Sequence, residues 1–140
     1  MSIDWTTGAL AAGLACYQRG EYFEAHEHWE DAWRPSVGRE RHLLQALVQI
    51  AVALRHHECG NLRGSLGVFR KALAHLRCCP ARFAGVDTDL LHSQISAWIE
   101  YLSVAGPETS PGQGIAPVVP ALSTAWLRLD AKTPKPISAR

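Results

Sequence analysis

The sequence lacks the charge surplus that would point to a nucleic-acid partner. Its 140 residues carry 14 lysines and arginines against 13 acidic residues, which leaves a net charge of +1. The two signs are mixed along the chain, and nucleic-acid binding rests on clustered positive charge. The composition therefore predicts no nucleic-acid partner.

Apolar runs of membrane-spanning length are also missing. The longest run, residues 43–54, contains Gln45 and Gln49 and is shorter than the roughly 20 residues that cross a bilayer as a helix. The apolar N-terminal stretch has its first basic residue at Arg19, so it lacks the charged start of a signal peptide. We expect no membrane partner and a cytoplasmic location.

Cysteine is scarce and forms no recognisable pattern. The four cysteines have no CxxC spacing, and the adjacent pair, Cys78 and Cys79, is poorly placed for an ordinary disulfide. We expect all four to be reduced residues that serve in packing. A Ser/His/Asp signature and a phosphate-binding glycine loop are not visible either.

What the sequence does contain is helical periodicity interrupted by glycine and proline. Gly20 and Gly60 are natural helix ends, and Pro35 and Pro80 interrupt the pattern. The predicted helices span residues 5–19, 21–34, 39–58, 62–77 and 87–102, and Asp87 or Thr88 is the expected cap of the last one. The sequence predicts an all-α fold of about five helices around a single core.

The composition changes after residue 105, where proline and glycine recur. We divide the chain into an all-helical domain, residues 1–105, and a linker with a C-terminal tail, residues 106–140. The tail is expected to pack on the domain as an extended strap or to be partly disordered. The apolar residues of that strap would be Val118, Val119, Leu122, Trp126 and Leu127.

Two of the predicted hairpins look related. An offset of 40 residues aligns Gly20 with Gly60 and Trp29 with Phe69. Repeated helix–glycine–helix units of this kind are typical of stacked helical hairpins. The repeat therefore predicts two such hairpins, with the fifth helix added to them.

His26 and Glu30 break the apolar face of the second helix. At about 100° per residue they fall beside Trp33 inside the apolar arc, and a spacing of four residues makes them neighbours on one surface. The repeat places Leu66 and Arg70 at the equivalent positions. Since ordinary residues can pack there, the polar pair needs another reason.

The third helix offers polar partners for this pair. Gln45, Gln49 and His56 follow the spacing i, i+4, i+11, which places them in a narrow stripe of an otherwise apolar helix. If the two helices pack antiparallel, His26 and Glu30 meet this stripe. The sequence thus predicts one interior polar cluster built from two helices.

The cluster has two interpretations. In the structural one, hydrogen bonds satisfy the cluster and an arginine such as Arg34 or Arg41 neutralises the acid. In the functional one, His26, Glu30 and His56 ligate a divalent metal ion of unknown identity, and His26 and Glu30 are the catalytic residues. The supporting residues would be Gln45, Gln49, Trp33 and Glu27.

Two segments carry a resemblance to a known family. They are GEYFEAHEHWEDAW and RHLLQALVQIAVALRHHECGNLRGSLGVFRKALAHL, and they resemble the small prokaryotic proteins called domain of unknown function 309. That family is all-helical and carries an HxxxExx(W/Y) motif, matched here by His26, Glu30 and Trp33. The resemblance covers about residues 9 to 77. It implies the helical fold, the importance of these residues and a metal-binding role, but no reaction.

Two function hypotheses follow. The first is a small metal-dependent enzyme, hydrolase-like, in which the metal ion activates a water molecule against a small-molecule substrate. The second is a helical-hairpin interaction module, similar to tetratricopeptide repeats, whose polar cluster only fixes the packing and whose partner is a protein. Two hairpins are few for such an array, so a homo-oligomer would extend the stack. An enzyme should leave the cluster open to a cleft.

Overall fold

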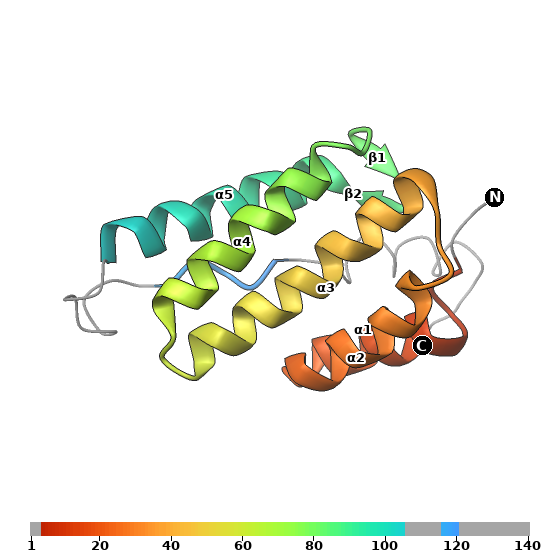
Figure 1. Cartoon of the computed structure of the whole chain (residues 1–140), viewed down its shortest axis with the longest axis horizontal. Helices are drawn as coiled ribbons and strands as arrows, with labels where there is room; N and C mark the ends of the chain where they lie inside the picture. The colour runs from red at the N-terminus through yellow and green to blue at the C-terminus, as the bar shows by residue number, and fades with distance from the viewer. Residues whose placement is uncertain (1–3, 106–115, 121–140) are drawn as a thin grey trace, which may run out of the picture.

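The computed structural model describes residues 4–105 and 116–120, and Figure 1 shows their arrangement. The helices are α1 (Gly8–Gln18), α2 (Tyr22–Trp33), α3 (Gly38–Glu58), α4 (Leu62–Leu76) and α5 (Thr88–Ala105). A two-stranded antiparallel ribbon, β1 (Arg82–Phe83) and β2 (Val86–Asp87), lies between α4 and α5. The predicted all-α fold is confirmed.

The helix ends follow the predicted punctuation closely. The last helix begins as expected after Asp87, whose Oδ1 accepts a hydrogen bond of 3.0 Å from the amide of Leu90. The main difference is at α1, which begins at Gly8 rather than Trp5. Trp5 lies before the helix, and its indole Nε1 donates to the carbonyl of Ala84 at 2.7 Å. This contact ties the N-terminal turn to the β ribbon.

The β ribbon was not predicted. Its two-residue loop holds Ala84 at φ +54° and Gly85 at φ +83°, and two consecutive positive φ values are the mark of a tight type I′ hairpin. Strands of two residues each are too short to show an alternating pattern in the sequence.

Helix α3 lies in the middle of the bundle, flanked by α2 and α4 (Figure 1). Its nearly continuous apolar sequence is explained by this position, because both sides of the helix are covered. Its buried residues are Leu43, Leu44, Ala46, Leu47, Val48, Ile50, Ala51, Ala53 and Leu54. α3 therefore presents few side chains to solvent, mainly near its ends.

Helices α1 and α2 pack unusually closely where Gly13 meets Trp29. A Cβ added at Gly13 would lie 2.4 Å from Nε1 of Trp29, and Trp29 is fully buried. Real Cβ atoms do not tolerate that distance, so only glycine fits here without a shift of the neighbouring ring. The residue pair fixes how α1 lies on α2, the helix that carries His26.

The described part of the tail, residues 116–120, has neither helical nor strand structure and lies against α5 and α1. The expected packing through Val118 and Val119 is not what the structure shows, because both valine side chains are exposed and the buried residue of the segment is Pro120. The other expected strap residues, Leu122, Trp126 and Leu127, lie outside the described residues. The described helices include none with the length and apolarity to cross a membrane.

Candidate functional site

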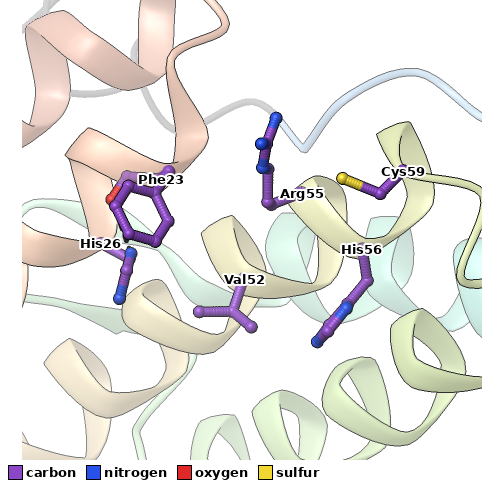
Figure 2. Close-up of a pocket in the computed structure, with 6 residues that line it drawn as sticks. All are labelled: Phe23, His26, Val52, Arg55, His56 and Cys59. Carbon is purple, nitrogen blue, oxygen red and sulfur yellow. Dashed lines mark hydrogen bonds between the residues drawn. The ribbon is translucent and has the colours of Figure 1, made fainter.

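A pocket of about 360 Å³ opens between α2 and α3. It is lined by Phe23, His26, Val52, Arg55, His56 and Cys59. Figure 2 shows the rings of His26 and His56 on either side of Val52, directed to the same side of α3, whereas Arg55 projects the other way. The two histidines that the sequence singled out thus line one cavity.

The ring of His26 is fixed by its own helix. Its Nδ1 lies 2.6 Å from the carbonyl oxygen of Phe23, and its ring meets the Phe23 ring edge-on with centroids 5.0 Å apart. A carbonyl can only accept a hydrogen bond, so Nδ1 carries the proton. In the neutral ring, Nε2 is then a bare acceptor. His26 therefore offers the pocket a lone pair in a defined orientation.

His56 is held in the opposite tautomer by Asn61. The Asn61 Oδ1 accepts from the amide of Gly64 at 2.9 Å and caps α4, so its Nδ2 is the atom 3.1 Å from Nδ1 of His56. Because Nδ2 donates, His56 Nδ1 accepts, and the proton of the ring is on Nε2. The pocket thus combines an imidazole acceptor at His26 with an imidazole donor at His56.

Arg55 and Cys59 complete the rim of the pocket. The Arg55 guanidinium lies 3.7 Å from the carboxylate of Glu58, and half of its side chain is exposed. Sequence reasoning missed both residues. The available signal was the spacing 52, 55, 56, 59, which repeats one turn of α3 on each side of His56. Their side chains add a positive charge and a thiol to the rim.

Glu30 does not line this pocket. Its carboxylate lies 3.8 Å from the guanidinium of Arg34, one turn further along α2, and 37% of the side chain is exposed. The expected interior cluster is therefore divided: His26 and His56 share a cavity, and Glu30 has the arginine partner of the structural interpretation. All three residues are partly exposed rather than buried.

The remaining predicted residues lie around the α2–α3 contact. Trp33 Nε1 and Gln49 Oε1 are buried and have no hydrogen-bond partner among the described residues. Gln45 is partly buried and Glu27 is exposed. An unpaired buried polar atom costs about 1–3 kcal/mol, so Trp33 and Gln49 keep polar capacity that the fold itself does not use.

Arg41 explains why Trp33 is held in place. Its guanidinium Cζ lies 4.2 Å from the centre of the Trp33 ring, and its Nη1 donates to the carbonyls of Trp33, Arg34 and Ser36. The carbonyls of Trp33 and Arg34 are at the C-terminal end of α2 and have no partner within the helix, and that of Ser36 follows in the loop. The Arg41 guanidinium therefore caps the C-terminal end of α2 and packs on the Trp33 ring at the same time.

The described residues contain no group of three or more histidine, cysteine, aspartate or glutamate side chains close enough to hold a metal ion. His26 alone has the arrangement typical of a metal ligand, with Nδ1–H bound to a carbonyl and Nε2 free. At His56 the Asn61 contact leaves the proton on Nε2 and so opposes ligation. The ligand set of His26, Glu30 and His56 stays a prediction.

These helices and their shared cavity define a small all-α protein with a two-histidine pocket. Residues 10–68 match the family model described as Domain of unknown function (DUF309), and the chain belongs to this family. The match includes the His26, Glu30 and Trp33 motif and every residue that lines the pocket.

A solved structure supports the fold. The crystal structure of a conserved hypothetical protein from Thermus thermophilus is 31% identical in sequence, with a TM-score of 0.57. The similarity covers 74% of this chain and 99% of that one. A search of curated proteins found no match.

Proposed function

We propose that the protein binds a small molecule in the pocket between α2 and α3 and that His26 and His56 act on it as an acid–base pair. The observation that carries this proposal is the pair of Nδ1 contacts, to the Phe23 carbonyl in His26 and to the Asn61 amide in His56, which assigns opposite tautomers to the two rings. One ring accepts a proton or hydrogen bond, and the other donates one. A pair of that kind is suited to moving a proton between two positions of a bound molecule.

The pocket indicates the chemistry of the ligand. A volume of about 360 Å³ is at the lower end of the range for small-molecule sites. Phe23 and Val52 offer apolar walls, and Arg55 adds a positive charge at the rim. The ligand is therefore a small, partly apolar molecule that carries a hydroxyl or amide group beside an oxygen acceptor, with an acidic group favoured over a basic one.

The test is a fragment screen on the full chain, followed by nuclear magnetic resonance of the histidine rings. We expect ¹⁵N shifts to place the ring proton on Nδ1 in His26 and on Nε2 in His56. Fragments of the stated chemistry should move both sets of signals at millimolar concentration or below. His26→Leu copies the residue at the equivalent position of the second hairpin, so it should keep the fold and weaken binding at least tenfold.

His28→Gln is the matched control, because His28 is on the same helix but does not line the pocket. This variant should bind fragments as the unmodified chain does. Reversed tautomers, or fragment binding that survives His26→Leu unchanged, would contradict the proposal.

Metal binding is the second candidate, and the free Nε2 of His26 is the observation in its favour. A divalent ion bound to the folded state raises the free energy of unfolding by about 2.7 kcal/mol at a hundredfold excess over its dissociation constant. Thermal melting with zinc, manganese, iron(II) and nickel, before and after chelation, measures this effect. If Glu30 is a ligand, Glu30→Gln abolishes the shift. If the acid–base proposal holds instead, no ion shifts the melting curve.

The interaction-module hypothesis is supported by the shared turns of the two hairpins. Gly20 and Gly60 both have φ +80° and both end a helix at the same point of the 40-residue repeat. This observation concerns the scaffold rather than the pocket, so the two functions are compatible in one molecule.

A further inference from the structure

The segment 116–120, with the sequence Ala-Pro-Val-Val-Pro, is held mainly through its backbone and its second proline. Trp98 Nε1 donates to the carbonyl of Val118 at 2.9 Å, and the Tyr17 hydroxyl donates to the carbonyl of Pro120 at 2.8 Å. Pro120 is fully buried, whereas Val118 is 71% exposed and Val119 is 43% exposed. The valine side chains therefore contribute little to the contact.

The two hydrogen-bond donors belong to helices far apart in the sequence. Tyr17 is on α1 and Trp98 is on α5, and Figure 1 shows the segment in blue, crossing the bundle at the level of α3 and α4. The segment thus joins two helices that are not neighbours in the sequence. The two aromatic residues thus hold carbonyls that are two residues apart in the same extended segment.

Both donors are built into the aromatic core. The Tyr17 ring lies 5.4 Å from that of Tyr22 and 5.7 Å from that of Trp29, and the Trp98 ring stacks on Phe69 at 5.3 Å. Burial raises the pKa of Tyr17 well above its usual value, so the hydroxyl stays protonated and keeps its role as a donor. Fixed donors reduce the entropy lost on binding.

We propose that the surface between Tyr17 and Trp98 is a recognition site for extended peptides that place a proline where Pro120 is buried, and that residues 116–120 are its tethered ligand. Aromatic N–H and O–H groups that donate to peptide carbonyls, beside a buried proline, are the means by which Pro-x-x-Pro segments are recognised in general. The donors of this site are on α1 and α5, and neither of them is among the residues that line the pocket between α2 and α3.

The linker that joins the segment to α5 determines how strongly the segment competes with a free peptide for the site. Ten residues, 106–115, join α5 to the ligand segment, and a short linker of this kind gives an effective concentration in the millimolar range. A free peptide must reach that concentration to displace the tethered segment. Cutting the tether removes this advantage and makes the site accessible to a peptide at lower concentration.

The experiment replaces residues 107–113 of the full chain with a protease recognition site and cleaves the folded protein. The probe is a synthetic peptide of residues 114–122, and the signal is the indole N–H resonance of Trp98. We expect the peptide to exchange with the cut segment and to hold the Trp98 signal at the position it has in the uncut chain. The same peptide with Pro120→Ala should bind at least tenfold more weakly.

Two variants test the hydrogen bonds. Tyr17→Phe and Trp98→Phe keep an aromatic ring but remove the donor, and each should weaken peptide binding about three- to tenfold, in line with the loss of one hydrogen bond. A peptide with both valines replaced by alanine should bind about as well as the original. Equal binding by the original and the Pro120→Ala peptides would overturn the proposal, as would the absence of exchange at several millimolar peptide.

The uncut chain gives an independent measurement should the cleaved protein lose its fold. In the uncut chain, Pro120→Ala should shift the Trp98 indole signal. The unmodified peptide, added at several millimolar, should then displace the altered segment and return the Trp98 signal to the position it has in the unmodified chain. A Trp98 signal that Pro120→Ala leaves unmoved, or that the peptide does not restore, would show that the segment is only a structural strap.

Discussion

The two helical hairpins, α1–α2 and α3–α4, share a turn but differ in the side chains beside it. In both, the amide after the glycine bonds back to the helix that has just ended: Glu21 to the carbonyl of Cys16 at 2.9 Å, and Asn61 to that of His56 at 2.8 Å. The backbone of the turn is therefore repeated faithfully. Its geometry depends on a glycine with positive φ rather than on any particular polar side chain.

The side chains show what each hairpin adds to this shared frame. The second hairpin caps its second helix with Asn61, whereas Glu21 at the same position makes no cap bond. The first hairpin carries His26, where the second has Leu66. Because the frame folds with leucine at that position, a packing requirement does not explain the histidine. This difference supports a functional role for the α2–α3 pocket.

The largest expected effect tests how the two hairpins pack. The repeat aligns Gly13 with Ala53 and Trp29 with Phe69, and in the first hairpin Gly13 lies directly against the Trp29 ring. Gly13→Ala should lower the free energy of unfolding by about 1–3 kcal/mol, because the new methyl group overpacks against Trp29. Urea denaturation followed by circular dichroism measures the loss.

The double variant Gly13→Ala with Trp29→Phe copies the pair of the second hairpin into the first. It should recover part of the stability that the first change removes, which a double-mutant cycle reports as a coupling energy. Gly67→Ala, at an exposed position of α4 with open space around it, is the control and should be stabilising. Strictly additive effects of the two changes would show that the pairs are not equivalent.

An intermediate effect is expected from the cap that only one hairpin has. Asn61→Ala removes the bond to the Gly64 amide, and the loss of an N-cap costs about 1 kcal/mol. It also releases Nδ1 of His56, so the ring proton is free to move to that atom. Denaturation measures the first effect and ¹⁵N shifts of His56 measure the second. Glu21→Ala should change stability less, and equal losses would refute the difference in capping.

The smallest expected effect concerns the pair of His42 and His75, which has no counterpart in the first hairpin. Nδ1 of His42 and Nδ1 of His75 lie 3.0 Å apart, and burial, with a smaller contribution from His42, lowers the pKa of His75 below its usual 6.5. Below about pH 6.5, the unfolded chain binds more protons at His75 than the folded chain does. The free energy of unfolding should therefore fall as the pH drops from about 6.5 through the lowered pKa.

His75→Gln should flatten this part of the stability curve, measured by denaturation between pH 7.5 and pH 5. A curve that keeps its slope in His75→Gln would assign the pH dependence to another group.

Local signals in the sequence predicted most of the fold. Gly20 and Gly60 ended helices, and Asp87 capped one, because each acts through its own backbone and its near neighbours. The β ribbon escaped prediction since its turn depends on two residues, Ala84 and Gly85, without flanking strands of useful length. Periodicity thus identifies long elements and misses the shortest ones.

The candidate site was predictable only in part. Helical spacing placed His26 and His56 on facing surfaces, but a wheel gives the direction of a side chain and not its height along the neighbouring helix. Arg55 and Cys59 share the spacing 52, 55, 56, 59 with His56, but whether these side chains reach α2 depends on the register of α2 against α3, which a single sequence does not supply. Glu30 lies 3.8 Å from Arg34, one turn away on the same helix, and this contact depends on the rotamers of the two side chains.

The hydrogen bond between Tyr17 and Pro120 also has a consequence for the order in which the chain folds during synthesis. The two residues are 103 positions apart, and at a synthesis rate of 5–20 residues per second Pro120 emerges about 5–20 s after Tyr17. Helices form far faster than that. During this interval the Tyr17 hydroxyl does not yet have the Pro120 carbonyl as its acceptor, and any docking of α1 on α2 depends on contacts within the first hairpin, such as that of Gly13 with Trp29.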